Sequence, residues 1–322
     1  MWSKDSFGEI KMKNIGFIGL GAMGGPMARN LVMGGNSVKG YDKDSTLVKK
    51  HGSIGGIAVN SSAEAASEVD FLFTMLPTHN IVEDALFGEN GAIDSLSENC
   101  ILIDMSTIHP IRSDEIRKKL ADRKIKMIDS PIGRTSKEAA EGKSLLMVGA
   151  VKSDIAILRP LFELLGDTII DCGGPGTGAR MKIVNNYMTT VLNVLSGETL
   201  TLSTALGIDI DTCLSVLNQT PAGKGHLSTT YPAKVLKGDL SPAFMIDLAF
   251  KDLKIGNSIS EELNLPLSLG KEATKAYIKA QEEGRGQQDW TAIFTSLLNQ
   301  TKTSSTLVKV RSKTRSLPER RE

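Results

Sequence analysis

A glycine-rich turn between an apolar strand and a helix constrains the fold of this chain more than any other feature. Residues 14–40, NIGFIGLGAMGGPMARNLVMGGNSVKG, read as an apolar strand, a turn, a helical stretch and a second strand, which is the order of a βαβ unit. The turn carries Gly19, Gly21 and Gly24 in G-x-G-x-x-G spacing, which lets a pyrophosphate approach the N-terminus of the following helix. The sequence therefore predicts a Rossmann-type dinucleotide-binding domain.

Asp42 indicates which dinucleotide binds. It stands at the end of the second expected strand, at the distance from the glycines where an acidic residue meets the adenosine ribose. A carboxylate there accepts hydrogen bonds from the ribose hydroxyls and repels a 2′-phosphate. NAD(H) is therefore expected rather than NADP(H).

Further short apolar runs predict more strands of the same sheet, at residues 71–77, 101–107, 126–131 and 144–150. Two of them end in polar or proline-containing turns, at residues 76–78 and 106–110. Cofactors in such sheets lie beyond the carboxyl ends of the strands. We therefore expect these two turns to border the nicotinamide half of the cofactor.

The second half of the chain is expected to be helical. From Gly173 a glycine and proline break leads into about thirty residues with helical periodicity, which predicts a long helix entering an all-helical domain. The expected organisation is an N-terminal extension at 1–13, a Rossmann domain at 14–175, an all-helical substrate and oligomerisation domain at 176–301, and a basic tail at 302–322. The tail has few large apolar residues, so we expect it to be disordered.

One face of the long helix is polar. Lys182, Asn185, Asn186 and Thr189 have i, i+3, i+4 and i+7 spacing, and apolar residues are interleaved with them. We therefore expect the helix to be buried on much of its surface, with a substrate cleft supplying partners for the polar groups. Downstream, residues 241–256 are expected to form a loop, and a late helix should precede the turn at 284–290.

Composition excludes several classes of protein. The net charge is only +1, and the basic excess lies from Lys302 onward, where seven basic residues accompany two acidic ones. The three cysteines lack zinc-site or disulfide-framework spacing, and no stretch reaches the roughly 18 apolar residues of a membrane helix. We expect a cytoplasmic protein with no metal and no membrane or nucleic-acid partner; a nucleic-acid-binding role for the tail is the less favoured reading.

The motifs taken together resemble one family. GLGAMG, the DMST turn, and G-x-G-x-x-x-K-x-x-x-N from Gly176 to Asn186 are similar to the β-hydroxyacid dehydrogenase family, over residues 14–298. The resemblance implies an α/β Rossmann N-terminal domain followed by an all-α C-terminal domain, and a homodimer or homotetramer. It implies that Lys182 is the catalytic acid/base, with Asn186 placing it and the substrate hydroxyl. The implied cofactor contacts are Gly19, Gly21, Ala22, Met23, Gly24, Asp42, Leu76, Thr107 and Lys251.

One segment departs from the family pattern. Where most members read D-x-P-V-S-G-G, this chain reads DSPIGRTS from Asp129 to Ser136, which puts a guanidinium and an extra hydroxyl where the acid group of the substrate should sit. Together with NNYM, AGKGH and GRGQQDW, this segment resembles the branch that reduces 3-sulfolactaldehyde to 2,3-dihydroxypropane-1-sulfonate with NADH in sulfoquinovose degradation. The implied substrate-binding residues are Ser106, Gly133, Arg134, Thr135, Asn185, Asn186 and Thr189.

Two alternatives stay open. The first is a reductase or dehydrogenase for a carboxylate semialdehyde, such as succinic, tartronic or methylmalonic semialdehyde, because Arg134 can bind a carboxylate too. The second is a non-catalytic dinucleotide-binding module that docks a partner through its tail. The presence of both Lys182 and Asn186 disfavours the second.

Overall fold

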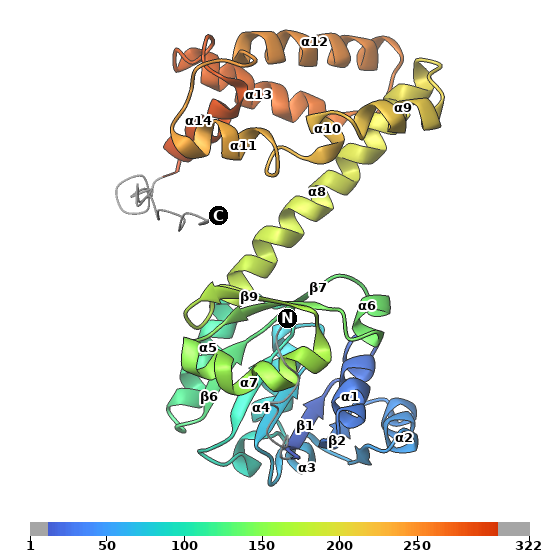
Figure 1. The fold of residues 1–322 in the computed structure, drawn as a ribbon, viewed down its shortest axis with the longest axis vertical. Helices are drawn as coiled ribbons and strands as arrows, with labels where there is room; N and C mark the ends of the chain where they lie inside the picture. Colours follow the sequence, from blue (N-terminus) through green and yellow to red (C-terminus); the bar gives the residue numbers. More distant parts are fainter. Residues whose placement is uncertain (1–11, 302–322) are drawn as a thin grey trace, which may run out of the picture. The chain divides into compact units, whose positions relative to one another are not determined.

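The structure, a computed structural model, describes residues 12–301 (Figure 1). The chain divides into two compact units, the first ending at Thr189 and the second beginning at Thr190. The expected disordered tail at 302–322 and most of the N-terminal extension, residues 1–11, lie outside the described residues.

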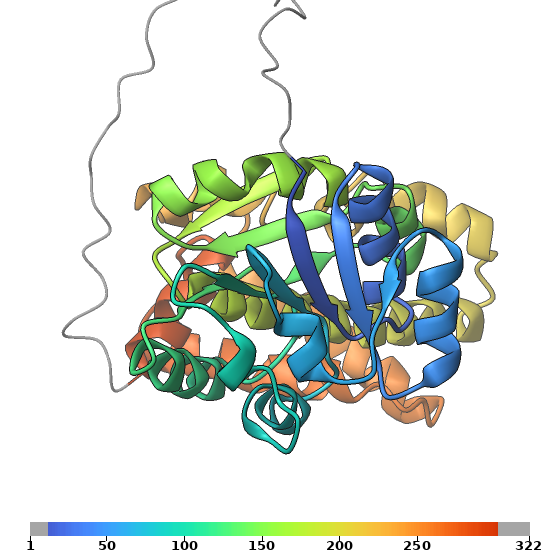
Figure 2. The same ribbon diagram turned by 90° about the horizontal axis from the view of Figure 1, so that it is seen from below.

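The first unit is built on one twisted sheet (Figures 1 and 2). Its strands are β1 (Asn14–Ile18), β2 (Ser37–Tyr41), β3 (Ile57–Ala58), β4 (Phe71–Thr74), β5 (Ile101–Asp104), β6 (Lys126–Asp129), β7 (Ile132–Gly133), β8 (Leu145–Gly149) and β9 (Thr168–Gly173). The order is β3-β2-β1-β4-β5-β6-β8-β7, with β9 also paired to β8. Strands β1 to β6 pair in parallel, β8 runs antiparallel to β6 and β7, and β9 is parallel to β8. The strand order reverses between β1 and β4, and sheets of this kind bind their ligands at that point.

Both faces of the sheet are buried, which explains the nearly continuous apolar runs. Along β4, Phe71 and Phe73 pack into one core and Leu72 packs into the other, because successive side chains of a strand point to opposite faces. The ring of Phe73 stacks on that of Phe17 of β1, with centroids 5.8 Å apart. Neighbouring strands are thus locked in register by side chains as well as by backbone hydrogen bonds.

Helices cover the two faces of this sheet. They are α1 (Gly24–Met33), α2 (Ser45–Ser53), α3 (Ser62–Ala66), α4 (His79–Phe87), α5 (Pro110–Ala121), α6 (Ser136–Ala140) and α7 (Lys152–Leu165), with a 3₁₀ turn, η1, at Ile93–Ser95. Buried residues of α1, α6 and α7 join one core, and those of α3, α4 and α5 join the other. Most of these helices begin at a capping side chain, as α4 does at Thr78 and α5 at His109.

The four further strands expected after the βαβ unit are confirmed as β4, β5, β6 and β8, each two or three residues shorter than its apolar run. Strands β4 and β5 end just before the two turns that were expected to border the nicotinamide half. The short strands β3 and β7 and the edge strand β9 were not expected. Strand β9 has mostly exposed or partly exposed residues, so it lacks the buried apolar run that revealed the others.

The second unit is helical, which confirms the expected fold class. Helix α8 (Thr177–Ala205) runs from the first unit into the second, where it is followed by α9 (Ile210–Leu217), α10 (Pro221–Lys224), α11 (Thr230–Ala233), η2 (Val235–Lys237), α12 (Ile246–Glu262), α13 (Ser268–Glu282), η3 (Trp290–Ala292) and α14 (Ile293–Asn299). A small core of Ile246, Ala280 and Ala292, flanked by Tyr277 and Trp290, holds the late helices together.

The loop expected at 241–256 is wrong from Ile246 onward, because α12 begins there. Ile246 and Ala249 are buried at helical spacing, and the start of the helix is fixed by Asp289, whose carboxylate accepts hydrogen bonds from the backbone of Ala243 and Phe244. That support comes from residues 40 positions or more downstream, so local sequence could not show it. The late helix before the 284–290 turn is confirmed as α13.

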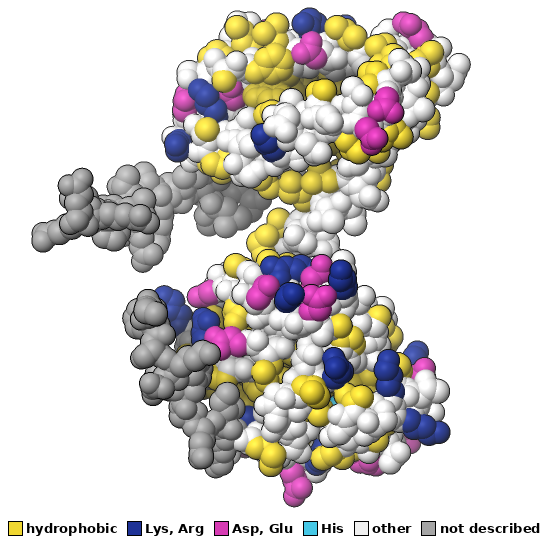
Figure 3. All heavy atoms as spheres, turned by 45° about the vertical axis from the view of Figure 1, so that its right-hand side comes forward, with side chains coloured by type: hydrophobic (Ala, Val, Ile, Leu, Met, Phe, Trp, Pro, Cys, Tyr) yellow, Lys and Arg dark blue, Asp and Glu magenta, His cyan; other side chains and the backbone are white. Residues whose placement is uncertain are grey.

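The expected burial of the long helix is also not observed. Apolar side chains of α8 lie at the surface (Figure 3), with Tyr187 73% exposed and Val184 61% exposed.

Candidate functional site

The glycine-rich turn leaves β1 and enters α1 with the geometry that a dinucleotide requires. Gly19 has φ +99°, and a Cβ there would lie 2.3 Å from the carbonyl oxygen of Met75. A Cβ on Gly24 would lie 1.9 Å from the carbonyl oxygen of Gly19, so the first and third glycines are required by the protein itself. A Cβ on Gly21 would meet nothing within 4 Å, so the second glycine faces open space. That space is where a bound pyrophosphate would approach the backbone.

The N-terminus of α1 is free to bind an anion. Met23, at the N-cap position, provides no capping hydrogen bond, and the first turn contains no acidic residue. Ala22, just before it, is exposed. The free N–H groups of a helix N-terminus and its dipole favour a phosphate.

Asp42 is tied to this turn by a direct hydrogen bond. One oxygen of its carboxylate accepts the backbone N–H of Leu20 at 2.8 Å, and the other accepts that of Asp44 at 2.9 Å. The carboxylate therefore stands in a fixed place at the end of β2. It lines a cavity of about 510 Å³ together with Gly19, Gly21 and Leu76. The structure thus brings together four of the residues predicted to bind the cofactor.

A buried polar network joins the carboxyl ends of β4 and β5. Ser106 accepts the backbone N–H of Leu76 at 2.9 Å through its hydroxyl oxygen, and its own N–H donates to Asp104 at 3.1 Å. Asp104 also accepts the hydroxyl of Thr74 at 2.9 Å. Burial of the Asp104 carboxyl raises its pKa to about 6, against the opposing effect of these hydrogen bonds. The predicted residues Leu76 and Ser106 are therefore held together, with the predicted Thr107 exposed beside them.

Thr74 and Asp104 were not predicted to serve the site. Both lie within the apolar runs that predicted strands, and both are buried. A polar residue near the end of a buried strand was the available signal, because a buried polar group needs a partner.

The Gly133 to Thr135 segment is ordered by contacts of its own. Gly133 is buried in β7, whereas Arg134 and Thr135 are exposed. Arg134 has a left-handed backbone with φ +72°, and its guanidinium donates to Asp167 at 2.6 Å, to Thr168 at 3.0 Å, and to the carbonyl oxygen of Lys143. The hydroxyl of Thr135 caps helix α6 in a capping box with Glu138. Both predicted anion-binding side chains thus have protein partners in this structure.

Lys182 lies on α8, one turn after the helix has left the sheet. Its side chain is half-buried, and this burial lowers the pKa of the amine below the ordinary 10.5. Asn185 and Asn186 are also half-buried and lie next to each other, with the Asn185 amide donating to the Asn186 side-chain oxygen at 3.1 Å. Thr189 is exposed. The polar face of α8 is thus more buried at Lys182, Asn185 and Asn186 than the apolar residues interleaved with them.

The start of α8 is bound to the sheet by Asp129, the last residue of β6. Its side chain is 1% exposed and accepts the backbone N–H groups of Gly176 at 2.5 Å and Ala179 at 2.7 Å. Arg117 of α5 donates to the same carboxylate at 3.1 Å. In the sequence, Asp129 stands out only as the first residue of the DSPIGRTS segment. Its hydrogen bonds to α8 could not be predicted.

Lys251 lies in the second unit, on α12. It is 61% exposed and ion-paired with its neighbour Asp252 at 3.1 Å. Within its unit it has the exposed position expected of a surface lysine whose stem covers apolar neighbours.

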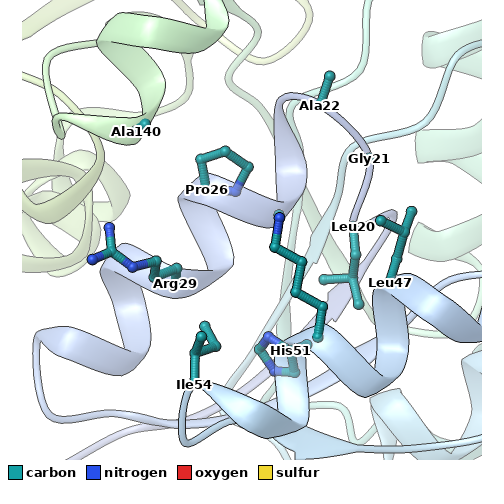
Figure 4. A pocket seen from close by; sticks show the side chains of 11 residues that line it. Leu20, Gly21, Ala22, Pro26, Arg29, Leu47, His51, Ile54 and Ala140 are labelled. Atoms are coloured by element: carbon teal, nitrogen blue, oxygen red, sulfur yellow. The ribbon is translucent and has the colours of Figure 1, made fainter.

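A second cavity, of about 280 Å³, lies against the other side of the glycine-rich turn (Figure 4). Helix α1 contributes Pro26 and Arg29 to its lining, and helix α2 contributes Leu47 and His51. The His51 ring is buried and its Nε2 lies 2.9 Å from the carbonyl oxygen of Val38. Of the predicted cofactor-binding residues, this cavity is lined by Gly21 and Ala22, whereas the larger one is lined by Gly19, Gly21, Asp42 and Leu76. The larger cavity therefore holds more of the residues predicted to bind the cofactor.

Neither a metal cluster nor a membrane span was found in the part of the chain that the structure describes. Residues 12–301 contain no group of three or more His, Cys, Asp or Glu side chains placed to hold a metal ion. No helix in the same range is long and apolar enough to cross a membrane.

Comparison with known proteins identifies relatives along most of the chain. Residues 14–174 match the family model of the NAD binding domain of 6-phosphogluconate dehydrogenase, and residues 176–297 match that of the NAD-binding domain of NADP-dependent 3-hydroxyisobutyrate dehydrogenase. The 3-sulfolactaldehyde reductase of Escherichia coli (strain K12) is 43% identical over 283 residues, which cover 88% of this chain and 95% of that protein. The mitochondrial 3-hydroxyisobutyrate dehydrogenase of Homo sapiens is 31% identical over 87% of this chain and 85% of its own length.

A solved structure shows the same arrangement of elements. The 3-hydroxyisobutyrate dehydrogenase of Mycobacterium tuberculosis, solved with L-serine, is 28% identical and covers 89% of this chain and 99% of its own, with a TM-score of 0.63. Sequence and fold therefore point to the same group of enzymes.

Proposed function

Because the chain belongs to the β-hydroxyacid dehydrogenase family of NAD-dependent oxidoreductases that act on CH–OH groups, we propose that it reduces 3-sulfolactaldehyde to 2,3-dihydroxypropane-1-sulfonate. In this role it would act in sulfoquinovose degradation. The observation that carries the proposal is Arg134, which follows Gly133 at the position where most family members have a small residue. The 43% identity to a 3-sulfolactaldehyde reductase supports the same substrate.

The cofactor is NAD(H), and the residues around the larger cavity fit it. Open space at Gly21, an uncapped α1 and the fixed Asp42 carboxylate match a pyrophosphate followed by a ribose that has free hydroxyls. Leu76 and Thr107 would border the nicotinamide half, and Lys251 would contribute from α12. We propose that Asp42 makes NAD(H) preferred over NADP(H).

Lys182 is proposed as the acid/base. When bound, the reduced nicotinamide supplies a hydride to the aldehyde carbon. The ammonium of Lys182 donates a hydrogen bond to the carbonyl oxygen and then gives it a proton, which leaves a neutral amine that solvent reprotonates. Burial already lowers the pKa of Lys182, which makes proton release easier. Asn186 would hold the substrate hydroxyl and the amine in place.

Arg134, Thr135, Asn185 and Thr189 are proposed to bind the sulfonate end, with Ser106 and Gly133 nearby. A sulfonate has three acceptor oxygens and suits guanidinium, hydroxyl and amide donors. Arg134 would exchange its present partners, Asp167, Thr168 and the carbonyl oxygen of Lys143, for the substrate. The side chains of Arg134 and Asp167 are 35% and 50% exposed, and exposed ion pairs contribute at most about 1 kcal/mol, so loss of this ion pair costs little.

The test compares kcat/KM for 3-sulfolactaldehyde and succinic semialdehyde, with NADH, in the wild type and in Arg134→Ala. The wild type should strongly prefer the sulfonate, and the variant should lose most of that preference. Arg159→Ala is the matched control, because Arg159 is an exposed arginine of α7 whose ion-pair partner is Glu163 of the same helix. Equal use of the two substrates by the wild type would contradict the proposed substrate.

A reductase for carboxylate semialdehydes is the second candidate. The relatives named 3-hydroxyisobutyrate dehydrogenase favour it, and an arginine also binds a carboxylate well. The same substrate comparison distinguishes the two candidates. The third reading, a non-catalytic module, would be excluded by NADH oxidation with any small acidic aldehyde.

We also propose a cytoplasmic homodimer or homotetramer. The three cysteines are all unpaired, which suits a reducing compartment. The apolar surface of α8 suits contact with a further copy of the chain. Light scattering of the purified protein would give the number of subunits.

A further inference from the structure

Helix α8 begins without a capping side chain of its own. Gly176, directly before it, has no side chain, and the hydroxyl of Thr177 donates to the carbonyl oxygen of Gly174 instead of accepting from the helix. The first N–H groups of a helix need acceptors from elsewhere. Here the acceptor is Asp129 at the end of β6, which binds the N–H groups of Gly176 and Ala179. A carboxylate from the sheet thus does what an N-cap side chain does in other helices.

The first turn of α8 is packed against the sheet without free space. A Cβ on Gly178 would lie 2.2 Å from the carbonyl oxygen of Met147 and 2.9 Å from Asp129. A Cβ on Gly149 would lie 2.6 Å from the N atom of Gly178. The first turn of α8 therefore rests directly on the backbone of β8, which explains the glycine at position 178.

A second attachment joins the same turn to α5. Arg180 binds Asp114, and Asp114 also binds Arg117, which in turn donates to Asp129. Arg180 also donates to the carbonyl oxygen of Gly176 at 2.7 Å. Two carboxylates and two guanidinium groups therefore surround the start of the helix, and all four belong to the first unit.

Lys182 follows Ala179 by three residues, which is about 4.5 Å along the helix axis. Any displacement of the first turn is passed to the lysine, because a helix is stiff over so short a distance. We propose that Asp129 is a positioning residue for the reaction: by holding the first turn of α8, it fixes where the Lys182 amine stands. The proposal rests on the proposed role of Lys182 as the acid/base.

The main test is Asp129→Asn. The new amide group can no longer accept an N–H at one of the two positions, so the first turn should shift. A misplacement of about 1 Å can cost on the order of 100-fold in rate. We expect kcat to fall about 10- to 100-fold while the Kd for NADH stays unchanged. The deuterium isotope effect with NADH labelled at the transferred position should increase, because hydride transfer becomes rate-limiting.

Asp154→Asn is the matched control. Asp154 of α7 is also a buried carboxylate, 7% exposed, but its ion-pair partner, at 2.7 Å, is Lys126 of β6 and not a residue of α8. Its loss should lower Tm and leave kcat and the isotope effect as in the wild type. The proposal is overturned if Asp129→Asn lowers only Tm, or if the two variants lose kcat equally.

Lys182→Ala, alone and combined with Asp129→Asn, separates this proposal from the proposed function. Full turnover by Lys182→Ala refutes the proposed acid/base, whatever Asp129→Asn does. If Lys182→Ala is impaired, adding Asp129→Asn should reduce kcat no further, because both changes remove the same proton transfer. If Asp129→Asn lowers kcat in the Lys182→Ala background as much as it does in the wild type, Asp129 does not act through Lys182. In that case only the positioning proposal fails.

If Asp129→Asn does not fold, Asp129→Glu takes its place. It keeps a negative charge beside Arg117 but shifts the carboxylate by one methylene group relative to the N–H groups of Gly176 and Ala179. A fall in kcat with the same rise in the isotope effect is expected. An unchanged kcat in this variant overturns the proposal.

Discussion

The carboxylate of Asp42 accepts the backbone N–H of Leu20 at 2.8 Å, so the residue that ends the second strand is fixed to the turn that ends the first. This hydrogen bond joins Asp42, which is proposed to bind the adenosine ribose, to the turn that is proposed to bind the pyrophosphate. A change at either position should therefore alter cofactor binding in a defined way.

Asp42→Asn should weaken the preference for NADH over NADPH. The amide keeps the shape of the side chain but loses the negative charge that repels a 2′-phosphate. We expect the ratio of kcat/KM for the two cofactors to fall by about tenfold or more. Asp44→Asn is the control, because Asp44 lines the same cavity and caps α2, and asparagine caps helices equally well. An unchanged ratio in Asp42→Asn would show that selectivity lies elsewhere.

Gly21→Ala should weaken NADH binding, whereas Gly24→Ala should lower the stability of the fold. The added Cβ at Gly21 meets no protein atom, so Tm should stay as in the wild type while affinity for NADH falls, because the methyl group occupies space needed by the pyrophosphate. The added Cβ at Gly24 meets the carbonyl oxygen of Gly19 at 1.9 Å, so Tm itself should fall. Thermal unfolding with and without NADH measures both effects. Unaltered NADH affinity in Gly21→Ala would place the pyrophosphate away from this turn.

Lys182→Ala should lower kcat by about 10² to 10⁴-fold, the usual contribution of a general acid/base. The Kd for NADH should remain near that of the wild type, since the turn and Asp42 are untouched. Lys152→Ala, an exposed lysine of α7, should have neither effect. Stopped-flow hydride transfer and fluorescence titration of NADH provide the two measurements, and retained turnover would remove Lys182 from the mechanism.

The pH dependence of kcat should have opposite signs for aldehyde reduction and for alcohol oxidation. Aldehyde reduction needs the ammonium form of Lys182, so its kcat should be constant at lower pH and fall as pH rises through the pKa of this lysine. Alcohol oxidation needs the neutral amine, so its kcat should rise over the same range. Burial lowers that pKa, so both changes should occur below pH 10.5. Profiles that change in the same direction would contradict a single acid/base.

Asp104→Asn should remove a pH dependence of stability. The pKa of Asp104 is raised from 3.8 to about 6, so the folded state binds the proton more tightly than the unfolded state. Its contribution to stability is therefore present at low pH and lost as pH rises from about 4 to 6, by roughly 3 kcal/mol in total. Urea unfolding at pH 4.5 and 7.5 should show a smaller fall in the variant than in the wild type. Asp122→Asn, on the surface at the end of α5, should follow the wild type.

The cofactor-binding half could be predicted from the sequence because its signals are local. Three glycines at fixed spacing, the strand before them and Asp42 after the next strand all lie within 30 residues. Their roles follow from backbone conformation and periodicity. The buried strands of a parallel sheet were equally visible, since both of their faces are apolar.

The contacts of Arg134, Asp129 and α12 could not be predicted, because their partners are distant in sequence. Arg134 binds Asp167, 33 residues away, and Asp129 binds Ala179, 50 residues away. Asp289 fixes the start of α12 from 40 residues or more downstream. No local sequence pattern indicates that two such distant residues are in contact.

The sequence by itself thus determined the glycine-rich turn, the buried strands of the sheet and the presence of Lys182 on a long helix. Only the tertiary structure decided what that helix is attached to. Asp129 meets the first turn of α8 because β6 and β8 lie side by side in the sheet and Gly178 touches β8. Close approach of this kind is a property of packing between distant segments, which periodicity and spacing do not encode.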